Sequence, residues 1–318
     1  MAADKFLMFQ NRLIKVYRHL GKQAKRLNIS CWRVYDHDLP EFPFCIEFYG
    51  DKLYVAEYKR RHGMDDEEHD NWMEQCLILM SEIFTLPKEN MFLKLRQRKP
   101  GRLGQYQKLD VVKNELIVEE GSLKFVVNLT DYLDMGLFSD HRVTRELVKE
   151  KAAGNKVLNL FAYTGSFSVY AAAGGASEVV TVDLSNTYLK WAERNMELNR
   201  FTDKDNYKFI AADVKQYLKT LPANYFDIVV MDPPTFSNSK KMKDDFLDIQ
   251  RDHVVLINDC LNAMNTGGIL YFSTNFRKFE LAADKIKAEA IKDITKDTTP
   301  FDFEGKLNRL CYEIKKRS

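Results

Sequence analysis

From about residue 140 to residue 275, short apolar segments alternate with longer segments of helical periodicity. The predicted strands are 156–161, 178–182, 207–211, 226–231 and 268–273, and the predicted helices are 163–173, 185–199, 214–221 and 246–264. Strands that are apolar throughout and separated by helices are typical of a parallel sheet covered on both faces. We therefore predict a doubly wound α/β fold whose ligands bind at the carboxyl ends of the strands.

The residues before this core have a different pattern, which predicts a small α+β domain. Residues 4–28 repeat apolar side chains every three or four positions, as in an amphipathic helix with a basic outer face. The order that follows is strand, strand, helix, strand and one further strand, predicted at 44–49, 53–58, 67–84, 91–98 and beyond. Two extended runs, 116–119 and 123–129, then turn at Gly121-Ser122. We expect one domain at 1–125 and a second at 126–318.

Positive charge is concentrated in two segments, although 48 basic and 46 acidic residues give a net charge of only +2. Residues 1–30 contain seven basic groups and one acid, and residues 94–108 contain six basic groups and no acid. Such a cluster can be an ordinary solvated face. Two clusters around one small module also suit nucleic acid, because neutralised phosphates release counterions. The residues that we expect to bind RNA are Arg96, Arg98, Lys99, Arg102, Lys240 and Lys241.

Several classes of protein are disfavoured by the composition. The apolar run Cys76–Met80 is as long as any in the chain, far below the roughly 20 residues that span a bilayer. The N-terminal residues lack the pattern of a signal peptide, so we expect a cytoplasmic protein without a membrane partner. Five scattered cysteines without CxxC spacing predict reduced thiols and no metal site.

Polar residues follow the first three predicted strands of the α/β core. The first strand runs into a turn that contains Gly165, the second ends at Asp183 and the third at Asp213. One glycine is too few for a dinucleotide fingerprint. An acid after the second strand can accept hydrogen bonds from ribose hydroxyls, although it can also be a simple helix N-cap. Three polar strand ends in succession favour a nucleoside pocket.

The fourth predicted strand leads into Asp232-Pro233-Pro234-Thr235-Phe236. Consecutive prolines restrict the backbone, so the carboxylate before them and the aromatic ring after them are held rigidly. Phe236 would stack on a planar base while Asp232 accepts from its amino edge. For His141 and His253, surface or helix-end roles are at least as good an interpretation as substrate contact, because no catalytic or metal spacing surrounds them.

The alternating core and the DPPTF segment resemble the class I AdoMet-dependent methyltransferases. A closer resemblance is to the RlmK-type guanine-N7 methyltransferases of 23S ribosomal RNA, which form one half of the bifunctional RlmKL enzymes. It rests on NRLIKVYRHLGKQAKR (11–26), YDHDLPE (35–41), NLTDYLDMGLFSDHR (128–142), NLFAYTGSFSV (159–169), TVDLSNTYLKWAERNMELN (181–199), DPPTFSNSKKM (232–242) and QRDH (250–253).

This resemblance implies AdoMet as cofactor, guanine N7 as the methylated atom, and 23S ribosomal RNA or a large-subunit precursor as partner. It implies catalytic roles for Asp232, Pro233, Pro234 and Phe236. The implied cofactor-binding residues, with Asp183 on the ribose and Asp213 near the adenine, are Asp140, Arg142, Asn159, Phe161, Ala162, Tyr163, Thr164, Gly165, Asp183, Leu184, Ser185, Asp213 and Val214. The THUMP domain and guanine-N2 methyltransferase half of RlmKL have no counterpart here, so we expect the RNA to be found unaided or with a separate partner.

The same sequence leaves four other functions as alternatives. Guanine-N2 methylation suits the same base grip. Cytosine-C5 methylation needs an attacking cysteine, and neither DPPTF nor Ser273-Thr274-Asn275 contains one, while Cys260 is better explained by core packing. A nicotinamide-dependent dehydrogenase would need the three-glycine turn. A non-catalytic RNA-binding protein would not need the acids of the nucleoside pocket.

Overall fold

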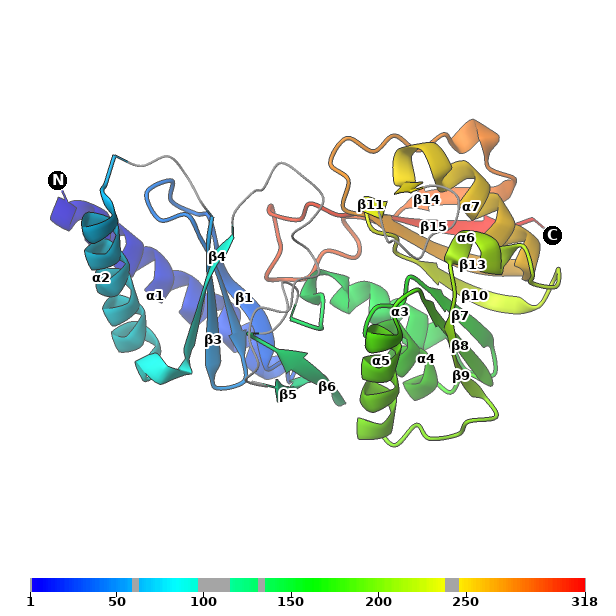
Figure 1. Cartoon of the computed structure of the whole chain (residues 1–318), viewed down its shortest axis with the longest axis horizontal. Helices are drawn as coiled ribbons and strands as arrows, with labels where there is room; N and C mark the ends of the chain where they lie inside the picture. The colour runs from blue at the N-terminus through cyan, green and yellow to red at the C-terminus, as the bar shows by residue number, and fades with distance from the viewer. Residues whose placement is uncertain (1, 59–62, 97–114, 131–134, 238–245, 318) are drawn as a thin grey trace. The chain divides into compact units, whose positions relative to one another are not determined.

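The computed structural model describes residues 2–58, 63–96, 115–130, 135–237 and 246–317 (Figure 1). The chain forms two compact units. The first contains Met1–Ser122, Val127–Met135 and Phe301–Lys306, and the second contains Leu123–Val126, Gly136–Pro300 and Leu307–Ser318. The division at residue 125 that the sequence suggests remains a prediction about which parts fold independently.

The first unit is built on a four-stranded sheet with the order β1-β2-β3-β4. Its elements are α1 (Ala2–Arg26), β1 (Cys31–Asp36), β2 (Phe44–Tyr49), β3 (Lys52–Tyr58), α2 (Asp66–Phe84), η1 (Lys88–Asn90) and β4 (Met91–Arg96). Strands β1 to β3 are antiparallel, and β4 joins β3 in parallel. The apolar face of α1 is buried, and Phe9 stacks on Phe42 with ring centroids 4.2 Å apart.

Strand β1 of this sheet was not predicted from the sequence. Its aromatic and β-branched side chains are buried, but they follow the long helix after a turn of only a few residues. The further strand predicted after 91–98 falls outside the described residues. The two extended runs predicted around Gly121 are confirmed as the paired strands β5 (Glu115–Glu120) and β6 (Leu123–Asn128). Gly121 between them takes the left-handed conformation, at φ 64°, that the turn requires.

The second unit contains a seven-stranded sheet with the order β14-β15-β13-β10-β7-β8-β9. Its strands are β7 (Lys156–Leu160), β8 (Glu178–Asp183), β9 (Tyr207–Ala211), β10 (Phe226–Met231), β13 (Met264–Thr274), β14 (Ala288–Asp293) and β15 (Leu310–Lys316). The five predicted strands are confirmed and run parallel. Two further strands, which were not predicted from the sequence, extend this sheet antiparallel: β15 joins β13, and β14 joins β15.

Helices cover both faces of this sheet. Helices α3 (Arg142–Lys151), α4 (Ser166–Ala173) and α5 (Asn186–Leu198) pack together on one face (Figure 1). Helices α6 (Val214–Leu218) and α7 (Ile249–Ala263) cover the other face, where they share an apolar cluster with the sheet. Three short elements are η2 (Ser139–His141), η3 (Ala283–Lys285) and the pair β11 (Phe236–Ser237) and β12 (Leu247–Asp248). Because 247–248 pair with β11, α7 begins at Ile249 rather than at the predicted residue 246. In the part of the chain that the structure describes, no helix is long and apolar enough to cross a membrane.

Candidate active site at the carboxyl ends of the parallel strands

The carboxyl ends of the parallel strands lie along one edge of the sheet. In the strand register, Leu160 of β7 pairs with Val182 of β8 and with Met231 of β10, and Met231 also pairs with Phe272 of β13. Phe161, Asp183, Asp232 and Ser273, which follow these positions in the chain, therefore leave the sheet at the same edge. The structure thus brings the predicted polar strand ends together.

The turn after β7 has three residues in the left-handed conformation: Phe161 at φ 54°, Tyr163 at φ 49° and Gly165 at φ 72°. For the two non-glycine residues this conformation costs about 1–3 kcal/mol each, and such strain concentrates at functional sites. Thr164, which lies between Tyr163 and Gly165, is held in place by two hydrogen bonds. Its hydroxyl donates to the carbonyl of Gly136 at 2.6 Å, and its carbonyl accepts from the side chain of Asn195 at 2.9 Å.

Gly165 also allows a close approach between this turn and α5. A Cβ atom at residue 165 would lie 2.6 Å from the Cβ of Ala192, well inside van der Waals contact. Both the positive φ and the contact therefore require glycine. The sequence pattern, with its single glycine, did not reveal either constraint.

Asp183 connects the ends of β7 and β8. Its Oδ2 accepts from the backbone N–H of Tyr163 at 2.9 Å, and its Oδ1 accepts from that of Ser185 at 2.8 Å. Burial raises the pKa of Asp183, although the hydrogen bonds from Ser185, Tyr163 and Leu184 oppose this rise. Ser185, and not Asp183, is the N-cap of α5. The N-cap alternative therefore does not explain Asp183, which has lone pairs left for hydroxyl groups of a ligand.

The N-cap alternative does describe Asp213. Its Oδ1 accepts from the backbone N–H groups of Lys215 at 2.8 Å and Gln216 at 3.4 Å, and Val214 behind it is buried. Asn159 also has an internal partner, because its amide nitrogen donates to Ser168 at 2.9 Å within the layer between sheet and helix. Their predicted contacts with a cofactor remain predictions.

Asp140 and Arg142 flank the start of α3. Arg142 is buried, while the side chain of Asp140 is partly exposed and lies 3.6 Å from the Nε of Arg309. Arg309 also donates from Nη2 to the backbone carbonyl of Asp140 at 2.9 Å. The sequence analysis missed Arg309, which lies beyond the alternating core where no pattern marks it.

The carboxylate of Asp232 is bound on both oxygens. The hydroxyl of Ser273 donates to Oδ1 at 2.5 Å, and the Nε2 of His141 lies 3.1 Å from Oδ2. Burial alone would raise the pKa of Asp232, but His141, the Ser273 hydrogen bond and the charge of Arg309 together hold it below its usual value. Asp232 is therefore ionised at neutral pH. In this state its carboxylate can accept hydrogen bonds, and because its pKa is lowered it is a weak base.

His141 was not assigned to the site from its sequence pattern, and the structure places it against Asp232. Of the two structural positions expected for it, the surface is wrong, because the residue is 4% exposed and its ring packs edge-on against Phe167 with centroids 5.4 Å apart. The helix end is correct, because His141 is the N-cap residue of α3. Its position between Asp140 and Arg142 in the chain was the available signal. His253 is structural, because its Nδ1 lies 2.9 Å from the carbonyl of Gln250 and its Nε2 accepts from the N–H of Ala282 at 3.1 Å.

The segment after Asp232 presents an aromatic ring to solvent. Pro233 is buried, and the hydroxyl of Thr235 donates to the side chain of Asn275 at 2.5 Å, which ties the segment to the end of β13. Phe236 follows, with 42% of its surface exposed and its ring 6.3 Å from that of Phe276. The ring is therefore available for stacking. Lys240 and Lys241 lie outside the described residues.

Two cysteines lie in the second unit, and both are fully buried. Cys311 of β15 pairs in register with Ser273, which makes it a neighbour of the Asp232 site that the sequence analysis did not consider. Burial raises the pKa of the Cys311 thiol to about 11, and burial also raises the pKa of Cys260. Both are thiols at neutral pH, which does not suit nucleophilic attack.

In the first unit, α1 carries a basic stripe, defined here as Lys15, Arg18, Lys22, Lys25 and Arg26. All five side chains are exposed, and at 100° per residue they fall within about 100° of the helix circumference. Among the described residues none of the five has a carboxylate partner, whereas Lys5 pairs with Glu41. Of the other basic residues expected to bind RNA, Arg98, Lys99 and Arg102 lie outside the described residues, and Arg96 is described only through its backbone at the end of β4.

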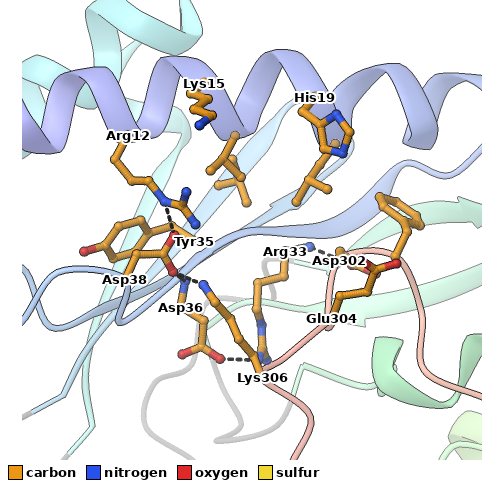
Figure 2. A pocket seen from close by; sticks show the side chains of 14 residues that line it. Arg12, Lys15, His19, Arg33, Tyr35, Asp36, Asp38, Asp302, Glu304 and Lys306 are labelled. Atoms are coloured by element: carbon orange, nitrogen blue, oxygen red, sulfur yellow. Dashed lines mark hydrogen bonds and ion pairs between the residues drawn. The ribbon is translucent and has the colours of Figure 1, made fainter. Parts of the chain in front are cut away.

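A cavity of about 220 Å³ lies beside this stripe, between α1, β1 and residues 301–306 (Figure 2). Three of its four lysine and arginine side chains are paired with carboxylates, and the fourth is Lys15 of the basic stripe. Arg12 contacts Asp38 at 2.5 Å, Lys306 contacts the same carboxylate, and Arg33 pairs with Asp36 at 2.7 Å. We interpret the cavity as an ion-paired joint within the first unit and not as a free anion site.

Across the described ranges, no three His, Cys, Asp or Glu side chains gather as metal ligands would.

Known proteins share the sequence pattern and the fold of this chain. The family model of S-adenosylmethionine-dependent methyltransferases matches residues 88–275. The ribosomal RNA large subunit methyltransferase K of Neisseria meningitidis is 48% identical over 312 residues, which cover 98% of this chain and 87% of that protein. The methyltransferase K/L of a Marinomonas species is 43% identical over 98% of this chain, but the chain spans only 43% of its length.

A solved methyltransferase in complex with SAH has the same fold, with a TM-score of 0.72 and 22% identity over 96% of this chain and 81% of that one. The expected α/β methyltransferase fold and the AdoMet cofactor are thereby confirmed. The chain belongs to the S-adenosylmethionine-dependent methyltransferase family.

Proposed function

We propose that this protein transfers the methyl group of AdoMet to N7 of a guanine in 23S ribosomal RNA, either free or in a large-subunit precursor. The names of its relatives, which are large-subunit ribosomal RNA methyltransferases, support the substrate class. The resemblance of its motifs to RlmK-type enzymes supports the N7 atom.

The strand ends fit the cofactor. Asp183 would bind the ribose hydroxyls with the lone pairs that its backbone partners leave free. The strained turn at 161–165 would lie against the ligand, with Asp213 near the adenine and with Asp140 and Arg142 in the same cleft. When bound, AdoMet supplies a methyl group activated by its sulfonium.

The observation that carries the proposal is the ionised, doubly bound carboxylate of Asp232 next to an exposed aromatic ring. Phe236 would stack on the guanine, while Asp232 accepts from N1–H and the exocyclic amine. Guanine N7 has a free lone pair and loses no proton when it is methylated. Orientation is then the main requirement, and holding the reacting atoms at about 3–3.5 Å can supply roughly 7–11 kcal/mol.

The competing products make different demands on these residues. Methylation of the exocyclic amine must finally release a proton, for which a carboxylate with a lowered pKa is a poor acceptor. Methylation at cytosine C5 needs a thiolate, and burial keeps Cys260 and Cys311 protonated. We expect activity to survive Cys260→Ala and Cys311→Ala.

The basic stripe of α1 would supply affinity for the RNA backbone that does not depend on sequence.

The experiment that tests the function is incubation of the protein with unmodified 23S RNA and labelled AdoMet, followed by mass spectrometry of the nucleosides. The proposal expects 7-methylguanosine. Recovery of N2-methylguanosine or 5-methylcytidine as the main product would reject the N7 assignment.

A further inference from the structure

We infer that His141 is a positioning residue for Asp232: it holds the carboxylate in the one orientation in which that carboxylate can grip the target base. The inference rests on the proposed function of Asp232, and it adds a residue from a different part of the chain to that site. No sequence pattern links His141 in η2 with Asp232, which follows β10.

The geometry leaves the carboxylate little freedom. Ser273 holds one oxygen of Asp232 from β13, and His141 holds the other from η2, so the two donors come from opposite sides of β10 in the sequence. Rotation of the carboxyl group would break both contacts. The lone pairs that remain free are therefore directed in a fixed way, which is what recognition of a planar amino edge requires.

His141 is itself held rigidly. Its side chain is 5% exposed, its ring packs on Phe167, and its backbone N–H donates to the carbonyl of Phe138 at 3.2 Å. The preceding residue, Asp140, is fixed by Arg309 through its carbonyl. A donor on such a support imposes its direction on its partner.

The hydrogen-bonding pattern of His141 separates it from a histidine that only fills the core. His253 has partners on both ring nitrogens, and all of them are backbone groups. His141 instead directs Nε2 at Asp232, while its buried Nδ1 has no hydrogen-bond partner among the described residues. Because an ionised carboxylate can only accept, Nε2 carries the hydrogen of this bond. The protein thus leaves one polar atom unsatisfied in order to keep a donor on Asp232.

The charged surroundings agree with this role. Asp232 is faced by His141, Ser273, Arg309 and the thiol of Cys311, and Asp140 lies beside Arg309. Removing His141 takes away the group that does most to favour the ionised form of Asp232, while the burial that disfavours this form stays. In such a variant Asp232 should need a higher pH to be ionised.

The test compares His141→Phe with His141→Gln, whose amide nitrogen can replace the Nε2 donor. His141→Phe should lose about ten- to a hundredfold in kcat/KM for RNA, as with other residues that orient a functional group through a hydrogen bond. When AdoMet is kept saturating at every pH, its activity should also gain an acid limb that the unsubstituted protein lacks under the same conditions. His141→Gln should recover most of the activity and lose the acid limb, while AdoMet affinity measured by titration calorimetry stays within about threefold in both variants.

His253→Phe is the matched control, since it removes a histidine of similar burial that does not contact Asp232. It should lower the melting temperature without adding an acid limb. Unchanged kcat/KM in a folded His141→Phe variant, or His141→Gln as impaired as His141→Phe with the same pH profile, would overturn the inference. The proposed function fails separately: if the unsubstituted protein makes a product other than 7-methylguanosine, the same variants still report on whether His141 positions Asp232 for that product.

Discussion

The carboxylate of Asp183 accepts a hydrogen bond at 2.9 Å from the backbone N–H of Tyr163, a residue that lies in the strained turn beyond β7. Asp183 therefore has two tasks in the proposed site: it stabilises the left-handed turn, and it faces a ligand with its free lone pairs. A buried carboxylate with a raised pKa is the cost of placing both tasks on one side chain.

Replacing Asp183 by alanine should abolish tight AdoMet binding. Two charge-assisted hydrogen bonds to the ribose, at roughly 1.5–3 kcal/mol each, would be lost, which corresponds to a decrease in affinity of about a hundredfold or more. Titration calorimetry measures the affinity, and circular dichroism confirms that the variant is folded. Unchanged affinity in a folded variant would place the cofactor elsewhere.

The pKa of Asp183 predicts how AdoMet affinity depends on pH. The pKa of Asp183 in the folded protein lies above the usual 3.8. At pH values above this folded-state pKa, the ionised carboxylate lowers the free energy of unfolding. This loss of stability disappears as the pH falls through the folded-state pKa. Protonation also removes acceptors for the ribose. Calorimetry between about pH 4 and 6.5 should therefore show weaker binding toward the acid end. Asp213→Ala, which leaves Asp183 in place, should keep this acid limb, and a flat profile for the unsubstituted protein would contradict the assignment.

Gly165→Ala should destabilise the protein and weaken AdoMet binding, because the new Cβ would meet Ala192 at 2.6 Å in a backbone conformation with φ 72°. Overpacking of this kind costs about 1–3 kcal/mol. Gly154→Ala is the matched control: φ is 73° there, but nothing lies within 4 Å of the added atom. In urea denaturation, an equal loss of stability in the two variants would show that the contact with Ala192 has no effect of its own.

Asp232→Ala and Phe236→Ala should each lower kcat/KM for RNA by about a hundredfold, while AdoMet affinity changes little. Base stacking on an aromatic ring is worth roughly 1–3 kcal/mol, and misplacement of the reacting atom adds to its loss. Phe246→Ala removes a phenylalanine of similar exposure, 37% against 42%, outside the DPPTF segment. We expect this control to keep its activity; equal losses in Phe236→Ala and Phe246→Ala would remove the stacking role.

The basic stripe of α1 predicts an RNA affinity that depends on salt. If its five cations meet phosphates, log K should fall with log salt at a slope of about −3.5 to −4.5. Reversing Lys15, Arg18 and Lys22 to glutamate should reduce the slope by about 2–3 without changing AdoMet affinity. Reversing Lys204, Lys219 and Lys296 instead gives the same net charge, because three reversals change +2 to −4 in either case. If both triple variants bind RNA equally, the stripe is a solvated face.

The parallel core was predictable because periodicity in the sequence reflects burial directly. Tyr207–Ala211 and Phe226–Met231 match the observed strands residue for residue. The antiparallel edge was not predictable, since β14 has a mixed, largely exposed surface and follows a region without alternation. Strand β1 was missed because its pattern was short and stood next to a strong helix signal.

Within the site, strand-end positions were predictable and side-chain partnerships were not. Asp183 and Asp232 could be found because each follows an apolar strand directly. His141 and Arg309 could not, because their roles depend on tertiary contacts with Asp232 and Asp140 that leave no trace in local spacing.

The most direct test of the central claim uses two matched RNA substrates, one with guanine and one with 7-deazaguanine at the modified position. The deaza base keeps the edge that Asp232 would grip and the face that Phe236 would stack on, but it lacks the lone pair at N7. Methyl transfer from labelled AdoMet should occur on the guanine RNA, giving 7-methylguanosine, while the deaza RNA should bind with similar affinity and accept no methyl group. Methylation of the deaza RNA would contradict the account.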